Sequence, residues 1–265
     1  MSFIVYFTIF IIGSVFGSFF SLAVYRLPRK EDITHVRSHC TTCNHELGFL
    51  DLIPIWSYLF LGGKCRYCKE KIRPRYILLE IFSGSVFLII ALTMRITYSS
   101  TLIEFINLSF IYLFLCALYI IGGIDNENYV IHSGTLLYGI IISLLYGLFR
   151  AIFFEESMKY NLIGFIFIPA VMLIISVALK SRISNEKLTW GFGDIKYISL
   201  IGLFMGYGMQ VIAIMLSVLI TLVMTIIKRK KRIPFGYYLS IATVITIILT
   251  PWVSEVGELL NLSFI

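Results

Sequence analysis

Four of the five cysteines stand in two repeats of the same short spacing and are the first candidates for chemistry. They form Cys40-x-x-Cys43 and Cys65-x-x-Cys68. A Cys-x-x-Cys turn presents two thiolates to one metal ion, and two such turns complete a tetrahedral zinc site. Two disulfides are the alternative. Four thiolates leave no position for water, so the predicted zinc is structural. Cys116 stands alone in an apolar stretch, where a small packing residue is expected.

Two of the four aspartates lie at the edges of long apolar stretches. Asp125 follows the apolar run at 120–124, and Asp194 ends a Gly-Phe-Gly-Asp run that starts at Gly191. Ionisable groups at membrane depth are costly and usually functional. Two carboxylates brought together share a proton, so that one is a base and the other an acid. Such a pair activates water for attack on a peptide carbonyl. Each aspartate by itself is equally well explained as a boundary residue.

Further residues near these apolar edges are candidates for a supporting role. Gly191 and Gly193 let the backbone approach a substrate strand closely. Lys196 either marks the membrane boundary or acts on the Asp194 carboxylate or on substrate. Glu80 lies about one turn inside an apolar stretch, where a carboxylate is expensive.

Motifs of rival chemistries are missing from the sequence. There is no Gly-x-Ser-x-Gly elbow for a serine hydrolase, no Walker loop and no dinucleotide-binding glycine fingerprint. These absences leave the aspartate pair as the favoured catalytic group.

The composition indicates a membrane protein. Of the 265 residues 58% are hydrophobic and only 14% charged, and the mean hydropathy is +0.90; a soluble domain carries about 25% charged residues. A spanning helix needs roughly 20 apolar residues. We therefore predict an all-α polytopic membrane protein with about eight transmembrane helices. The apolar stretches are 3–25, 76–94, 102–124, 129–149, 161–179, 195–207, 209–227 and 235–252. The break at 206–208 is a tight turn; without it, the sixth and seventh would merge.

The basic residues predict the orientation. If the N-terminus lies outside, all of the 22 lysines and arginines except Arg95, Arg150 and Lys159 fall on the inside, as the positive-inside rule requires. The segment 26–75 is then cytoplasmic, where thiols stay reduced, which favours zinc over disulfides. The net charge of +7 is therefore explained by topology. Lipid is an expected partner and nucleic acid is not.

Three regions follow from this pattern. They are a first transmembrane helix at 1–25, a cytoplasmic zinc-binding loop at 26–75 and a transmembrane core at 76–265. A polar loop of this length buries little core by itself and needs a metal staple.

Several other loop residues receive simpler interpretations. The loop aspartates and histidines are expected to be solvated, and the aromatic side chains of 56–60 either rest on the membrane interface or pack normally. These residues are Asp32, Asp51, His39, His45, Trp56, Tyr58 and Phe60.

Taken together, the motifs resemble the type IV prepilin peptidase family, in its smaller competence-pseudopilin branch. The resemblance runs from about residue 10 to 236, in the family's order. It consists of Gly17-Ser18-Phe19-Phe20-Ser21-Leu22-Ala23-Val24-Tyr25-Arg26-Leu27-Pro28, Arg37-Ser38-His39-Cys40-Thr41-Thr42-Cys43, Lys64-Cys65-Arg66-Tyr67-Cys68, Arg75-Tyr76 with Glu80, Asp125 with Ile131, Gly191-Phe192-Gly193-Asp194-Ile195-Lys196 and Ile233-Pro234-Phe235-Gly236.

The resemblance implies an activity. Family members cut a short basic leader from pilin-like precursors at the cytoplasmic face of the bacterial inner membrane, which makes Asp125 and Asp194 the catalytic pair. Many also methylate the new N-terminus with S-adenosylmethionine, an activity associated with the cysteine loop and the Glu80 region. The alternatives are another Gly-x-Gly-Asp intramembrane protease and a zinc-stapled membrane scaffold without enzymatic activity.

This chain departs from the family pattern at four positions, none of them a proposed catalytic group or zinc ligand. Ser21 stands where the family usually has Asn. Thr41, His132 and Tyr237 stand where it usually has Pro.

Overall fold

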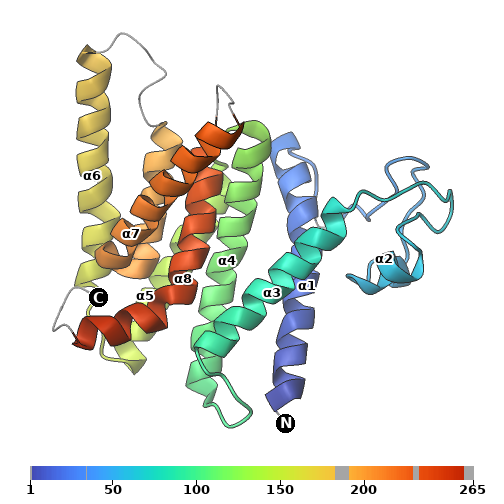
Figure 1. Cartoon of the computed structure of the whole chain (residues 1–265), viewed down its shortest axis with the longest axis horizontal. Coiled ribbons are helices and arrows are strands. Elements are labelled where there is room, and N and C mark those ends of the chain that lie inside the picture. The colour runs from blue at the N-terminus through green and yellow to red at the C-terminus, as the bar shows by residue number, and fades with distance from the viewer. Residues whose placement is uncertain (1, 34, 183–190, 229–232, 260–265) are drawn as a thin grey trace. The chain divides into compact units, whose positions relative to one another are not determined.

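The computed structural model describes residues 2–33, 35–182, 191–228 and 233–259 (Figure 1). This part of the chain is helical and contains no β-strand, and seven of its helices are long and apolar enough to cross a membrane. The predicted all-α polytopic fold is confirmed. The long helices are α1 (Ser2–Arg26), α3 (Arg75–Thr93), α4 (Leu102–Asn128), α5 (Ser133–Phe153), α6 (Lys159–Arg182), α7 (Phe192–Lys228) and α8 (Phe235–Leu259).

Helix α7 accounts for the difference between seven long helices and eight predicted spans. It contains both 195–207 and 209–227, with a non-helical Gly206 at φ 78° and ψ 166°. The Gln210 side chain donates to the Ile198 carbonyl at 2.8 Å, although these residues would lie about 18 Å apart in an unbroken helix. The chain therefore reverses at Gly206, where the sequence predicts a tight turn. Asn161 caps the carbonyls of Leu203 and Phe204 at the end of the first arm.

The chain divides into two compact units, Met1–Thr101 and Leu102–Ile265. In the first unit α1 packs along α3. A Cβ on Gly13 would come within 2.8 Å of Phe87, and one on Gly17 within 2.9 Å of the Leu79 carbonyl oxygen. Small residues at these two positions let the helix backbones approach closely. The predicted division at residues 25 and 75 remains a prediction.

The second unit is a bundle of α4 to α8. Within it α8 packs against α4 and α7, while α5 packs against the same two helices and α6 lies along α7. Stacked rings fill part of its core: Phe114 and Phe204 have centroids 3.8 Å apart, and Tyr146 stacks on Phe204 at 4.6 Å. Cys116 is buried here, as expected for a packing residue.

Candidate active site and cysteine centre

Asp125 lies in the last turn of α4 and is held by the first turn of α8. Its side chain is buried, and its Oδ2 accepts the backbone N–H of Tyr237 at 3.0 Å. A Cβ on Gly236 would lie 3.0 Å from the same oxygen. The unpaired N–H groups and the dipole at a helix N-terminus suit a carboxylate. The backbone of α8 therefore fixes where the Asp125 carboxylate lies.

Asp194 lies in the first turn of α7, within the same unit. Its Oδ2 accepts the backbone N–H of Gly191 at 3.2 Å, as an acidic side chain does in a helix capping box. The charges of Asp194 and Asp125 are close enough to interact. Gly193 faces Ile131 in the α4–α5 connection, where an added Cβ would lie 3.4 Å from the Ile131 Cβ. The two aspartates predicted as a pair are thus neighbours, although 69 positions of sequence separate them.

A hydroxyl contact that sequence reasoning missed joins α7, which carries Asp194, to α8, which packs on Asp125. The Tyr197 hydroxyl lies 2.7 Å from the Ser240 Oγ in the buried core, and Ser240 also donates to the Gly236 carbonyl at 2.9 Å. A Cβ on Gly122 of α4 would come within 2.4 Å of the Ser240 Oγ. Tyr197 and Gly122 are each three residues from an aspartate. No spacing rule in the sequence connects Tyr197 with Ser240.

The two remaining support candidates lie apart in the sequence and have different contacts. Lys196 is exposed, and its Nζ lies 4.9 Å from the centre of the Phe192 ring. Among the residues described, it forms no ion pair with Asp125 or Asp194. Glu80 belongs to the first unit, is buried, and accepts the backbone N–H of Ile55 at 2.7 Å. That contact gives Glu80 a structural role in holding the loop.

The four loop cysteines form one cluster. Their sulfur atoms all lie within 4.8 Å of one another, and Cys40 and Cys68 are 3.8 Å apart and not disulfide-bonded. A tetrahedral zinc with Zn–S bonds of about 2.3 Å would place its sulfurs roughly 3.8 Å apart. The N–H groups of Cys43 and Thr42 lower the pKa of Cys40 to about 6 by hydrogen-bonding its sulfur. The donor set fits a metal ion.

Each pair of cysteines sits on the same small knuckle of backbone. The N–H of Cys40 donates to His45 and its carbonyl accepts from Asn44, while Cys65 repeats both contacts with Glu70 and Lys69. Asn44 and Lys69, each four residues after the first cysteine of its pair, have left-handed φ angles of 57° and 61°. The equal spacing in the sequence therefore corresponds to two equivalent turns.

The prediction that Asp51 is a solvated carboxylate is wrong. Its side chain is 5% exposed, and its Oδ1 lies 2.6 Å from the Arg66 Nε; its Oδ2 accepts the Gly48 N–H. Burial opposes ionisation, but the hydrogen bonds from Arg66 and Gly48, and the charge of Arg66, outweigh it and hold the pKa of Asp51 below its usual value. Asp51 thus ties the second knuckle to the short helix η2 (Phe49–Asp51).

Arg26, counted in the sequence only as an inside charge, organises the start of the loop. It is buried, and its guanidinium donates to the carbonyls of Asp32, Val36 and Arg37 at 2.8–3.4 Å. The His45 and Tyr67 rings are tilted against each other with centroids 3.6 Å apart, and this contact joins the two knuckles. Other predicted inside charges, in 183–190 and 229–232, lie outside the described residues.

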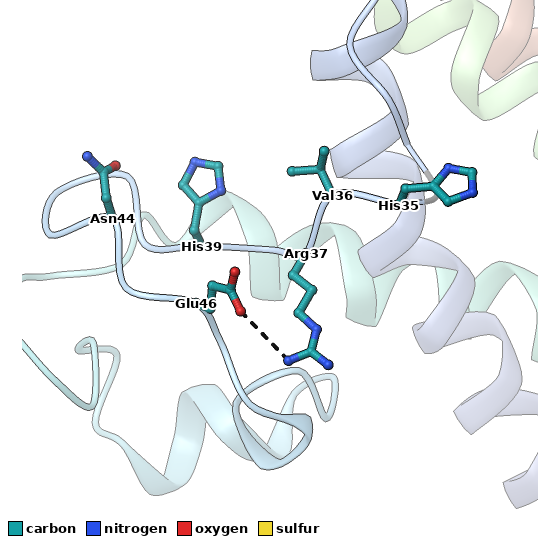
Figure 2. Close-up of a pocket in the computed structure, with 6 residues that line it drawn as sticks. All are labelled: His35, Val36, Arg37, His39, Asn44 and Glu46. Atoms are coloured by element: carbon teal, nitrogen blue, oxygen red, sulfur yellow. Dashed lines mark ion pairs between the residues drawn. The ribbon is translucent and has the colours of Figure 1, made fainter.

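An open hollow lies beside the first knuckle (Figure 2). It is lined by His35, Val36, Arg37, His39, Asn44 and Glu46. The Arg37 Nη1 and Glu46 Oε2 are 3.7 Å apart across it, and both side chains are well exposed. His39 is exposed, as predicted, and the cysteine cluster does not include it.

Comparison with known proteins shows which proteins this chain resembles. Residues 11–94 match the bacterial peptidase A24 N-terminal domain. A prepilin leader peptidase/N-methyltransferase of Klebsiella pneumoniae is 26% identical over 206 residues, covering 75% of this chain and 84% of the relative. The protein of that name from Pseudomonas putida is 25% identical over 276 residues, covering 93% and 90%. The chain is thus similar to type IV prepilin peptidases along most of its length.

The segment matched by the peptidase domain, residues 11–94, contains the four cysteines, Arg26 and Glu80. A further relative, the prepilin leader peptidase/N-methyltransferase of Vibrio cholerae, is 40% identical over 79 residues, which cover 27% of this chain and 31% of the relative. No solved structure matches the chain. The likeness to these relatives, together with seven apolar helices, indicates a multi-pass inner-membrane protein.

Proposed function

We propose that this protein is an aspartyl endopeptidase that removes the basic leader peptide from type IV prepilin-like precursors at the cytoplasmic face of the membrane. Its relatives are named prepilin leader peptidases. The observation that supports the proposal is that Asp125 and Asp194, at the ends of two helices, lie within range of each other's charge, with the first turn of α8 against Asp125. The substrates are type IV prepilins, or pseudopilins if the chain belongs to the competence branch.

Asp125 and Asp194 would share one proton and divide the work of hydrolysis. The ionised carboxylate takes a proton from water as the water oxygen attacks the scissile carbonyl carbon. The protonated carboxyl group supplies its proton as the C–N bond breaks, so that the leaving nitrogen departs as an amine. The Gly236 and Tyr237 backbone and the Tyr197–Ser240 contact hold the carboxylates in register. Gly191 and Gly193 give the backbone beside Asp194 room for a substrate strand.

The cysteine centre is proposed to hold structural Zn2+. The sulfurs of Cys40, Cys43, Cys65 and Cys68 are a donor set that zinc prefers, and four thiolates leave no coordination position for a reacting water. The ion would lock the two knuckles together, and it has no part in peptide hydrolysis.

Methylation of the new N-terminus, with S-adenosylmethionine as the methyl donor, is the second activity proposed. It rests on the relatives' name, prepilin leader peptidase/N-methyltransferase. The described residues around the knuckles show an open hollow and no closed cradle for an adenosyl group. We therefore assign no step of methyl transfer to particular residues.

The peptidase proposal is tested by cleavage of a prepilin precursor in membranes that contain the wild type, Asp194→Asn or Glu127→Gln. Glu127 is an exposed acid on the same helix end as Asp125 and serves as the matched control. Loss of a general acid or base costs about 10²–10⁴-fold in rate. We expect that loss for Asp194→Asn and near-normal cleavage for Glu127→Gln. Equal processing by wild type and Asp194→Asn would refute the aspartyl mechanism.

A further inference from the structure

The short helix α2 (Trp56–Phe60) carries an unusual surface for a segment between two membrane spans. Trp56, Leu59 and Phe60, at helical positions i, i+3 and i+4, are 49%, 61% and 81% exposed. The rings of Trp56 and Phe60 stack on each other with centroids 5.9 Å apart. We call these three side chains the apolar face of α2. An exposed cluster of large apolar side chains marks an interaction site.

The hydrogen bond from Ile55 to Glu80 places the start of α2 beside the first turns of α3, an apolar helix long enough to span a membrane. Glu80 lies five residues into α3, or about 7.5 Å along its axis at 1.5 Å per residue. The Ile55 N–H, immediately before α2, reaches the Glu80 Oε2 at 2.7 Å. Gly17 of α1 faces the same turn: a Cβ there would lie 3.0 Å from the Glu80 Cα. Figure 1 draws α2 to one side of α3, on the same side as the start of that helix.

Ile55, immediately before α2, has a backbone conformation that is rare for its residue type. Ile55 has φ 64° and ψ −54°, which is an outlier for a β-branched residue. Strained residues persist only where the surrounding contacts determine them. The buried Glu80 carboxylate supplies such a contact, so that α2 is pinned beside the start of α3.

The neighbouring surface agrees with a lipid partner. Phe49 and Leu50 of η2, which packs against α2, are 83% and 63% exposed. On α3 itself, Leu78 and Phe82 are also exposed. The second knuckle, directly after α2, presents the exposed lysines Lys64, Lys69 and Lys71, which complement anionic headgroups. Tyr58, by contrast, turns inward onto Gly63.

We propose that the apolar face of α2 inserts into the lipid bilayer at the headgroup–acyl boundary, beside the start of α3. The occupant of this surface is lipid, with Trp56 at the depth that tryptophan prefers. Glu80 acts as the pin that holds α2 at this depth. The loop is then anchored to the membrane at three places: the end of α1, the start of α3 and α2.

The experiment uses Trp56 as a depth probe. The full chain has three tryptophans, Trp56, Trp190 and Trp252; Trp190→Phe with Trp252→Phe leaves only the one in α2. This variant is placed in nanodiscs of phosphatidylethanolamine and phosphatidylglycerol, with bromine at the upper acyl carbons or with none. We expect about a twofold loss of fluorescence with brominated lipid and weak quenching by aqueous iodide, as for an interfacial ring.

Two further variants move the single tryptophan to other positions, one on the same face of α2 and one in the exposed first knuckle as a control. In the tryptophan-free background, Phe60→Trp should behave like Trp56, whereas Thr41→Trp in the exposed first knuckle should be quenched by iodide and not by bromine. Strong iodide quenching at both Trp56 and Phe60→Trp, without bromine quenching, would overturn the proposal. So would protection of Trp56 that appears only when a prepilin peptide is added, because α2 would then bind substrate instead of lipid.

Discussion

The cysteine centre and the aspartate site differ in how far along the chain their parts come from. Each half of the cysteine centre is a turn of a few residues with its own repeated hydrogen bonds, at Cys40 and at Cys65. The aspartate site draws on three helices, and its contact from Tyr237 to Asp125 spans 112 residues. A centre built from local turns can be recognised from spacing, whereas a site built by helix packing requires the fold.

The most direct test of this difference is to remove one functional group from each site and to measure cleavage and metal content. Asp125→Asn keeps the shape of the side chain but removes its ionisable group, so cleavage should fall by at least about 10²-fold. The metal content of the protein should not change. Cys65→Ser, at the buried cysteine, should lower the metal content instead. Leader cleavage and metal analysis of the same preparations measure both effects.

Two results with Asp125→Asn would contradict this account of the two sites. Asp125→Asn protein that has lost metal would show that the aspartate change disturbs the loop. Full cleavage by Asp125→Asn would remove the carboxylate pair from the mechanism.

The packing of α8 on Asp125 offers a second test. The added methyl of Gly236→Ala would lie 3.0 Å from the Asp125 Oδ2 and must displace the carboxylate. A misplacement of this kind costs roughly 10- to 100-fold in rate. Gly139→Ala is the control, because its methyl meets the end of the flexible Leu200 side chain. Comparable cleavage rates for the two variants, at equal protein levels, would argue against backbone positioning of Asp125.

The two sites also differ in how much of each was predictable. The cysteine ligands and the aspartate pair follow from residue type, spacing and position at apolar edges. The helices, and the turn at Gly206, follow from hydropathy and glycine. The Tyr197–Ser240 contact and the hold of α8 on Asp125 could not be predicted, because helix packing brings those residues together.

Asp51 was misread for a related reason, and the contacts of Arg26 could not be foreseen. Asp51 and Arg26 have the sequence context of solvated or topogenic charges, yet both are engaged in specific hydrogen bonds. Burial of a charge depends on partners supplied by folding, and neither Arg66 nor the carbonyl of Val36 is identifiable as a partner from spacing.

Replacing Tyr237 should have a smaller effect on the cleavage rate than the changes at Asp125 and Gly236. This chain has Tyr where the resembling family usually has Pro, and its N–H is a donor to Asp125. Proline lacks that N–H but is tolerated in the first turn of a helix. Tyr237→Pro should therefore fold and slow cleavage by a few-fold, since one hydrogen bond contributes about 1 kcal/mol. Leader cleavage measured against the wild type, with Tyr237→Phe as the control that keeps the N–H, tests this. An unchanged rate for Tyr237→Pro would mean that the donor is dispensable.

The smallest effect is expected in the loop, where Asp51 contributes to stability in a pH-dependent way. Because contacts with Arg66 and Gly48 lower the pKa of Asp51 in the folded protein despite its burial, this contribution is fully present above the unfolded value of about 3.9. It is lost as the pH falls through the lower folded value. Asp51→Asn should therefore weaken the loop modestly at pH 6, and its deficit relative to wild type should shrink from pH 5 to pH 3. Loss of metal in acid affects both proteins and cancels in the difference. Limited proteolysis between α1 and α3 reports the stability of the loop, and a deficit that grows as the pH falls would contradict the assignment of the Asp51–Arg66 pair.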